Sequence, residues 1–197
     1  MKPKAKASAA VISRDGKYRY KLSRRWTPGS DRAVWILLNP STADAVEDDA
    51  TIRRSISFAK RWGYDGIDVY NLFALRSRHP IRIEIVDDPV GPDNDRWLSV
   101  AAQTTGKVIA AWGACNTPVQ MRRANEVIQF LLRDRYVLLS TLGLTKSGQP
   151  RHPLYVRNDA PLIPLDRPQA LASSIDKHTF PADKRRQMSS NYANPNT

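Results

Sequence analysis

Short apolar runs alternate with amphipathic stretches over most of the chain. Four runs have the length and composition of buried strands, at residues 34–38, 67–73, 108–112 and 136–140. Between them apolar residues recur at helical spacing, in the sets Ile52, Ile56, Ala59 and Trp62; Trp97, Leu98, Ala101 and Ala102; and Ala124, Val127, Ile128, Leu131 and Leu132. Strands that alternate with helices pair in parallel through right-handed crossovers. The pattern predicts a three-layer α/β/α sandwich whose central, mainly parallel sheet has four strands.

An N-terminal β-hairpin is expected before the first of these strands. Residues 10–13 lead into an Asp15-Gly16 turn, and apolar and polar residues alternate over residues 18–22. An Asp-Gly pair supplies the positive-φ corner that such a turn needs. We expect this hairpin at an edge of the sheet.

Composition divides the chain into three segments. Residues 1–9 are mostly Lys, Ala, Ser and Pro without periodicity, and are predicted to be a disordered basic arm. Residues 10–166 are predicted to form one α/β domain, which agrees with a length of 197 residues. Residues 167–197 are predicted to be a polar C-terminal tail.

Positive charge is concentrated near the two ends. The net charge is +12, from 31 Lys and Arg against 19 Asp and Glu. Residues 1–25 hold nine basic residues and one acidic residue, and residues 167–197 hold five and two. Such a field attracts phosphates, so DNA, single- or double-stranded, is the expected partner. The alternative is a solvated arm that only improves solubility.

The number of cysteines and the hydropathy of the chain indicate where in the cell the protein is expected. Cys115 is the only cysteine and cannot form an internal disulfide. The sequence shows neither a charged-then-apolar leader nor an apolar run near the roughly 20 residues of a membrane span. We expect a cytoplasmic protein with no membrane partner, and a monomer.

Polar residues follow each predicted strand, in four loops at residues 39–44, 71–79, 113–118 and 142–156. Ligands of open α/β sheets bind beyond the carboxyl ends of the strands, so these loops are the candidate site. Polar loops occupy that position in any α/β domain, which is the alternative interpretation.

Several common chemistries lack their motifs. Neither a G-x-x-x-x-G-K-[ST] nor a G-x-G-x-x-G phosphate loop is present. His79, His152 and His178 stand far apart without metal-ligand companions, so we expect neither a metal nor another cofactor. Cys115 is a candidate nucleophile, but a lone cysteine near a strand end is more often a small buried residue.

Together the four loops resemble the motifs of the uracil-DNA glycosylase superfamily, in the same chain order. The stretches that carry the resemblance are Leu38-Asn39-Pro40-Ser41, Tyr70-Asn71-Leu72-Phe73, Ala111-Trp112-Gly113 and His152-Pro153-Leu154-Tyr155-Val156. The first is similar to the Asn-Pro form of the water-positioning motif found in mismatch-specific members. Leu37-Leu38 replace the Gly-Gln of the uracil-specific motif, and Leu154 replaces a serine, so the resemblance does not imply uracil specificity.

Residues 18–165 also resemble a bacterial and phage family catalogued as domain of unknown function 1643. The likeness is carried by residues 38–44, 51–54, 88–95 and 143–146. This second resemblance is the more specific one, and it brings no established activity. Residues 88–95 have no counterpart in the glycosylases, and are interpreted as a loop over the pocket or as a helix cap.

The glycosylase resemblance implies roles for three residues. Asn39 would orient the attacking water, Asn71 would read the edge of the base, and His152 would hydrogen-bond the departing base. An amide cannot take a proton at neutral pH, so Asp44 is the candidate general base, ahead of Asp48 and Asp49. The further candidates are Pro40, Ser41, Phe58 and Phe73 for the substrate, and Lys146, Arg151, Tyr155, Arg157 and Arg53 for nucleic acid.

Purely structural interpretations stand beside these roles. Asn39 before a proline also suits a turn, and His152 also suits a surface loop. Phe58 and Phe73 also suit core packing. Asp48 and Asp49 suit the cap of the helix that follows them, where the positive charge of Arg53 calls for an anionic ligand or a carboxylate.

Three functions are compatible with these features. The first is a metal-independent DNA glycosylase that hydrolyses the N-glycosidic bond of a flipped damaged or modified base, in repair or in phage–host conflict. The second is a non-catalytic nucleic-acid-binding module, which Asn39 in place of an aspartate would permit. The third is an enzyme that acts on free nucleosides or nucleotides.

Overall fold

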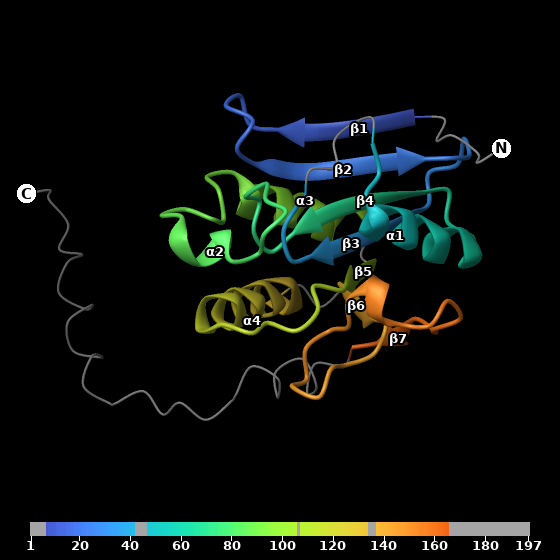
Figure 1. The fold of residues 1–197 in the computed structure, drawn as a ribbon. Helices are drawn as coiled ribbons and strands as arrows, with labels where there is room; N and C mark the ends of the chain where they lie inside the picture. The colour runs from blue at the N-terminus through green and yellow to red at the C-terminus, as the bar shows by residue number, and fades with distance from the viewer. Residues whose placement is uncertain (1–6, 42–46, 106, 134–136, 166–197) are drawn as a thin grey trace, which may run out of the picture.

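A computed structural model of the protein describes residues 7–41, 47–105, 107–133 and 137–165 (Figure 1). Its elements are β1 (Ala7–Ile12), β2 (Arg19–Arg25), β3 (Arg32–Leu37), α1 (Ala50–Arg61), β4 (Gly66–Asn71), α2 (Arg82–Ile85), α3 (Asn94–Thr105), β5 (Lys107–Ala110), α4 (Pro118–Arg133), β6 (Leu138–Thr141), the 3-10 helix η1 (Pro153–Tyr155) and β7 (Ile163–Pro164). The predicted α/β class is confirmed.

The strands form one mixed sheet in the order β1-β2-β4-β3-β5-β6-β7. Strands β4, β3, β5 and β6 are parallel to one another and correspond to the four predicted runs. Strand β2 pairs antiparallel with β4, and β7 pairs antiparallel with β6. The prediction of a four-stranded sheet is therefore wrong: the described residues form seven strands, because the hairpin and a short C-terminal strand extend both sides.

The N-terminal hairpin is confirmed by the antiparallel pairing of β1 with β2. Gly16, with φ of 72°, lies in the turn, where a left-handed backbone favours glycine. β1 begins at Ala7, so residues 7–9 belong to the sheet and not to the predicted arm 1–9. Residues 1–6 and 167–197, which carry the rest of the arm and the predicted tail, lie outside the described residues.

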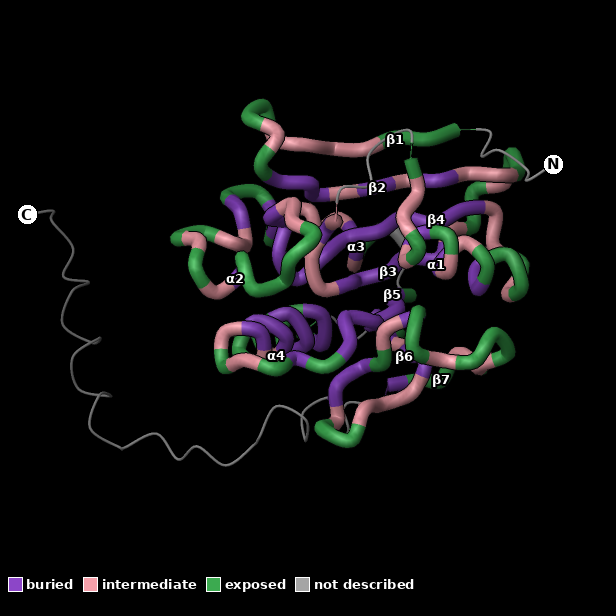
Figure 2. The backbone as a smooth tube through the Cα atoms, in the orientation of Figure 1, coloured by how far each residue is buried: buried purple, intermediate pink, exposed green. Residues whose placement is uncertain are grey.

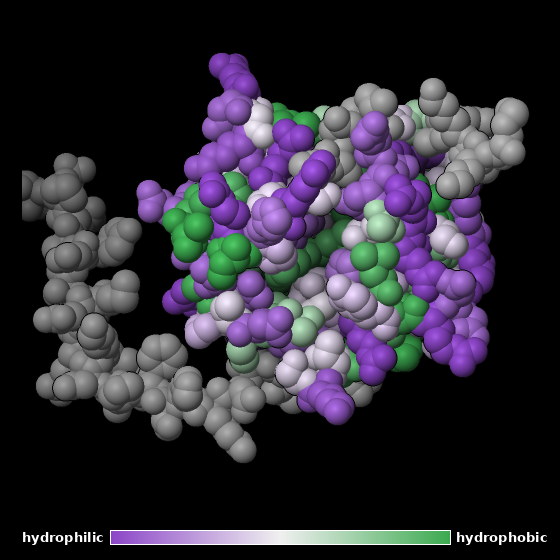
Figure 3. Space-filling view, viewed as in Figure 1, coloured by the Kyte–Doolittle hydropathy of each residue, from purple (hydrophilic) through white to green (hydrophobic). Residues whose placement is uncertain are grey.

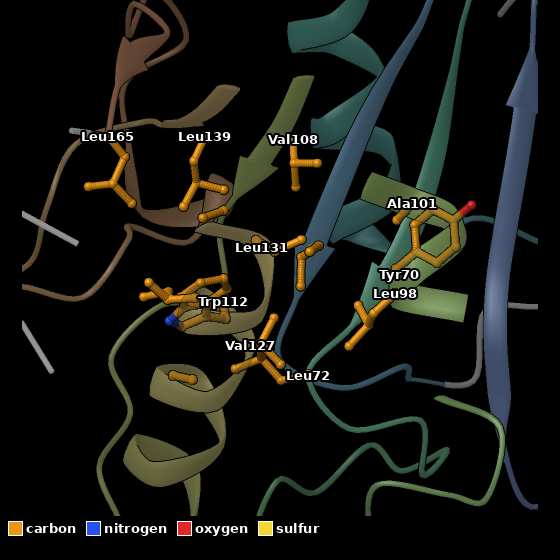
Figure 4. Packing of buried hydrophobic residues seen from close by; sticks show 14 of the residues in the cluster. Tyr70, Leu72, Leu98, Ala101, Val108, Trp112, Val127, Leu131, Leu139 and Leu165 are labelled. Carbon is orange, nitrogen blue, oxygen red and sulfur yellow. The ribbon is translucent and has the colours of Figure 1, made fainter. Parts of the chain in front are cut away.

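Alternation along β3 builds one hydrophobic core on each face of the sheet. Val34 and Ile36 pack with α3 and α4, in the cluster of Figure 4, whereas Trp35 and Leu37 pack with α1. Side chains of a strand alternate between faces, and both faces here are covered, so the strands read as continuous apolar runs. Figure 2 shows this buried centre between more exposed peripheral segments. The described elements thus form three layers: α1, the sheet, and α3 with α4.

Local signals in the sequence fix the ends of α1. The carboxylate of Asp49 accepts a hydrogen bond from the backbone N–H of Ile52 at 2.8 Å, as an N-cap does. Lys60 and Arg61 lie in the last turn, where positive charge complements the helix dipole. Gly63, with φ of 83°, follows the C-cap. Asp49 therefore holds its capping position at the carboxyl edge of the sheet, where α1 begins.

Candidate active site

A cavity of about 760 Å3 opens at the carboxyl edge of the parallel strands. Figure 3 shows a hollow in the viewed face, with hydrophobic residues at depth and both hydrophilic and hydrophobic residues around it. Its lining residues are Arg19, Leu37, Leu38, Asn39, Ser41, Asp49, Thr51, Ile52, Ser77, Arg78, Pro80, Trp112, Gly113, Ala114, Asn116, Gln120, Thr145, Lys146, Arg151, His152 and Tyr155. Each of the four predicted loops contributes to this lining, so segments far apart in the chain meet around one cavity.

Asn39 lies two residues after the end of β3 and lines the cavity. Its side-chain N–H group donates to the carbonyl oxygens of Pro40, at 3.1 Å, and Ser77, at 3.0 Å. Pro40 is buried, and its carbonyl also accepts from the backbone N–H of Ser77 at 2.9 Å. Because both donor bonds go to backbone carbonyls, the orientation of the amide is fixed and Oδ1 is left as its acceptor.

Asp49 is a carboxylate of the cavity lining. It lines the cavity, and its second oxygen accepts a hydrogen bond from the hydroxyl of Ser41. Asp48 instead pairs with the buried guanidinium of Arg24 at 2.8 Å and is not part of the lining. Asp44, the predicted base, lies outside the described residues. Among the carboxylates considered as the base, Asp49 is the one that the described structure places at the cavity.

His152 precedes η1 and, like Asn39, lines the cavity. Its Nδ1 accepts the backbone N–H of Leu154 at 3.3 Å, so a neutral ring carries its proton on Nε2. Burial lowers the pKa of His152 below its ordinary value, and the charge of Asp49 opposes that shift only in part. The ring of Tyr155 lies 5.5 Å from the imidazole, measured between centroids. His152 is therefore held as a neutral hydrogen-bond donor.

Helix α1 anchors the His152 loop through Arg54. The guanidinium donates to the carbonyl of Pro153 at 3.2 Å and to that of Val156 at 2.6 Å. Arg53, the preceding residue, is exposed and donates to the carbonyl of Asp48 instead. The positive charge that opens α1 is thus directed to backbone oxygens, and Arg53 is not among the residues that line the cavity.

Positive charge dominates the described part of the lining. Arg19, Arg78, Lys146 and Arg151 contribute four cations, against the single carboxylate of Asp49. Arg19 is 2% exposed, whereas Lys146 and Arg151 stand at the rim. Such a cavity favours an anionic ligand, because the summed field of these groups is positive.

Asn71 ends β4, in register with Leu37 of the neighbouring strand. Residues in register on parallel strands share a face, so the Asn71 side chain lies on the face from which Leu37 lines the cavity. Asn71 is 1% exposed and is not among the residues that line the cavity. Neither its Nδ2 nor its Oδ1 has a hydrogen-bond partner among the described residues. A buried amide without partners costs free energy unless a ligand or water bonds it.

Several predicted contacts are not at the cavity. Phe58 is buried between Trp35 and Trp62, with ring centroids 6.4 and 5.3 Å away, so its predicted stacking on a base is wrong. Phe73 is buried in the other core, and its predicted stacking is corrected in the same way. Arg157 is exposed, pairs with Asp159 at 3.1 Å, and does not line the cavity. Phe58 lies on α1 and Phe73 just after β4, and an apolar pattern alone does not separate core residues from the wall of a pocket.

Two residues of the cavity lining, Arg19 and Gln120, were not predicted from the sequence. Arg19 is one of many basic residues near the N-terminus, and only the pairing of β2 with β4 brings it to the cavity. Gln120, on α4, is 6% exposed and accepts the backbone N–H of Asn116 at 3.1 Å.

Cys115 is buried, and burial raises its thiol pKa to about 12, so it does not supply a thiolate nucleophile.

The described residues provide neither a metal site nor a membrane-spanning helix. No group of three or more His, Cys, Asp or Glu side chains there is placed to hold a metal ion. No helix within those residues has both the length and the apolar character that crossing a bilayer demands.

The fold and the site together define an α/β protein with a cationic cavity at the carboxyl edge of its sheet. The chain belongs to the family described as "Protein of unknown function (DUF1643)", whose model matches residues 19–154. The matched segment contains every described residue of the cavity lining except Tyr155. No curated protein and no solved structure matches the chain.

Proposed function

We propose that the protein hydrolyses the N-glycosidic bond of a base that has been extruded from DNA. The observation that carries this proposal is the convergence of Asn39, Asp49 and His152 on one cavity, together with an unpartnered buried amide at Asn71, which is in register with Leu37 of the lining. The motif order that resembles the uracil-DNA glycosylase superfamily supports it, as does the parallel centre of the sheet with helices on both faces.

Water activation falls to Asn39 and Asp49. The fixed amide of Asn39 presents Oδ1 as an acceptor, which orients a water molecule but takes no proton. Asp49 is the proposed proton acceptor in place of Asp44, because it lines the same cavity. Ser41, predicted as a substrate contact, hydrogen-bonds Asp49 and is proposed to position that carboxylate.

The base is proposed to lie between His152 and Asn71. A neutral His152 donates from Nε2 to a carbonyl oxygen of the base, on which negative charge develops as the glycosidic bond breaks. The amide of Asn71 offers one acceptor and two donor hydrogens, which match the alternating groups on the edge of a pyrimidine. Binding a base there would also satisfy the buried amide.

The rim is proposed to hold the DNA backbone. Lys146 and Arg151 follow β6 and provide cations for phosphates. Leu154 and Tyr155 of η1 are 41% and 80% exposed, which is unusual for large apolar side chains. They are proposed to occupy the gap that the extruded base leaves in the stack.

Abasic-site formation tests the proposal. Labelled single-stranded and duplex oligonucleotides carrying a panel of damaged and modified bases are incubated with the protein, and strand breaks are counted after hot alkali. Cleavage by the wild type, lost in Asn39→Ala and His152→Ala, is the expected result. The matched controls Asn158→Ala and His79→Ala change exposed residues outside the cavity lining and should retain cleavage.

The same assay separates the two alternatives. DNA binding with a steep salt dependence but without cleavage indicates a non-catalytic module. Cleavage confined to free nucleosides indicates the third function. Either result contradicts the proposed reaction on DNA.

A further inference from the structure

Arg19 brings a buried positive charge to the cavity lining. It begins β2, is 2% exposed and lines the cavity, and its backbone N–H donates to the carbonyl of Ala74 at 2.9 Å. Strand β2 is the neighbour of β4, which ends in Asn71. Arg19 therefore enters from the side of the sheet where the base is proposed to bind.

The rim cations enter from the opposite side. Lys146 and Arg151 follow β6, and strands β4, β3 and β5 lie between β2 and β6. Neighbouring strands are about 4.8 Å apart, so the two ends of this arrangement are separated by several strand spacings. The phosphate contacts proposed at the rim thus leave Arg19 without a role in backbone binding.

The proposed reaction needs a positive charge at the base. The pair of electrons from the broken bond stays on the ring nitrogen, so the base departs as an anion. His152, held neutral, and the amide of Asn71 both bring dipoles but no charge. A guanidinium stays protonated at every pH that a folded protein meets, and its charge acts strongly where water is excluded.

We propose that Arg19 is a catalytic residue that binds the departing base and stabilises its negative charge. This inference rests on the proposed function. In the step, the C1′–N bond breaks with its electron pair on the base, and the water oxygen bonds C1′. The proton of that water passes to Asp49, and the base anion held by Arg19 later takes a proton from solvent.

The donor set of Arg19 also limits the substrate. A guanidinium has five N–H donors and no acceptor, so the base must present a carbonyl oxygen or another acceptor to it. A base that must first be protonated on its ring would bring a second cation beside Arg19. The substrate class is therefore a carbonyl-bearing base that leaves as an anion.

Equilibrium binding of two free bases tests the assignment without any cleavage. The probes are uracil, which is neutral at neutral pH, and 5-nitrouracil, whose acidic ring N–H is ionised there. The wild type is expected to bind 5-nitrouracil on the order of tenfold more tightly, the effect of one hydrogen bond to a charged group. The variant R19Q should bind both bases equally. Arg25→Gln removes the same charge from the far end of β2, outside the cavity lining, and should keep the wild-type ratio.

Leaving-group dependence gives a second readout on any base that the protein excises. Replacing that base by its 5-fluoro analogue makes it a better leaving group, which needs less stabilisation. R19Q should lose more rate on the poorer leaving group, and the loss should fall on kcat more than on KM. A merely structural role would lower both rates by the same factor.

The outcomes separate the two proposals. If the wild type excises bases but binds uracil and 5-nitrouracil equally, the role of Arg19 is overturned and the proposed function stands. If nothing is excised, the proposed function fails, and the binding ratio alone decides whether Arg19 holds an anionic base. Should R19Q not fold, Arg19→Lys keeps the charge and is expected to keep the preference for 5-nitrouracil. A folded Arg19→Lys protein without that preference contradicts the assignment.

Discussion

Gly113 and His152 are packed against each other in the lining of the cavity: a Cβ atom added to Gly113 would lie 3.1 Å from the Cβ of His152. Gly113 has φ of 84°, and its N–H donates to the carbonyl of Pro150 at 2.9 Å. The turn after β5 therefore sets the position of the imidazole that follows β6.

The substitution Gly113→Ala is expected to destabilise the fold by ~1–2 kcal/mol, because a side chain is disfavoured at positive φ. It should also lower the excision rate, because His152 must move. Gly63→Ala is the matched control: its φ is 83°, but no atom lies within 4 Å of an added Cβ. Urea unfolding and excision assays should show similar stability losses, with a rate loss only in Gly113→Ala. Equal rates in both variants would refute the positioning role.

The stability of the protein should depend on pH through His152. Burial lowers its pKa below the ordinary value of 6.5, so the unfolded chain binds the proton more readily than the folded protein. The contribution of a neutral His152 to the free energy of unfolding is then fully present above about pH 6.5, and it is lost as the pH falls toward the lowered pKa of the folded protein. The variant His152→Gln should remove that part of the pH dependence, measured as urea midpoints across this window. His79→Gln, an exposed control, should follow the wild type.

Asp68 forms a buried ionic centre within the sheet. The carboxylate is 1% exposed and lies 3.0 Å from Lys21 Nζ, 3.5 Å from Arg32 Nη1 and 2.5 Å from the Ser23 hydroxyl. Asp68→Asn leaves two partly buried cations without their counterion and should cost ~2–4 kcal/mol. The exposed ion pair between Asp159 and Arg157 provides the control, since Asp159→Asn should leave the urea midpoint unchanged. An unchanged midpoint for Asp68→Asn would contradict the coupling.

The centre of the sheet was predictable from sequence because its strands are buried on both faces. Their apolar runs need no knowledge of the partner strands, and the caps of α1 are local as well. The short elements α2 and β7 lack such a signal, being four and two residues long. Asp68 shows the limit: an acid inside an apolar run is visible, but its partners Lys21 and Arg32 are brought to it only by the sheet order.

Site prediction divides in the same way. Asn39 was predictable because it follows an apolar run directly, and His152 because it lies in the loop after the last run, since strand ends meet at one edge of a parallel sheet. Arg19 was not, because it reaches the cavity through the antiparallel pairing of β2 with β4, which no local pattern encodes. The prediction for Phe58 was wrong for a different reason: an aromatic side chain suits both core packing and stacking on a base, and Phe58 packs in the core.

Phe58 supplies a direct test of that correction. Its ring is 1% exposed, and the guanidinium carbons of Arg54 and Arg61 lie 5.0 and 5.1 Å from its centroid. The substitution Phe58→Leu should destabilise the protein by ~1–2 kcal/mol through lost packing and lost cation–π contacts. Affinity for oligonucleotides, measured by fluorescence anisotropy, should not change. A large loss of affinity in a folded Phe58→Leu protein would restore the stacking role.

Lys146 tests the proposed phosphate contact at the rim. It is exposed, lines the cavity and follows β6, and it lies in the loop at residues 142–156 that the sequence predicted as part of the site. If it neutralises one phosphate, Lys146→Gln should weaken binding to all DNA sequences alike and reduce the slope of log K against log salt by about 1. Arg133→Gln removes an exposed charge at the end of α4, outside the cavity lining, and should leave that slope unchanged. Anisotropy titrations over a series of salt concentrations measure both slopes. Equal slopes for the two variants would place the DNA backbone away from this rim, and with it the orientation in which the extruded base reaches Asn71.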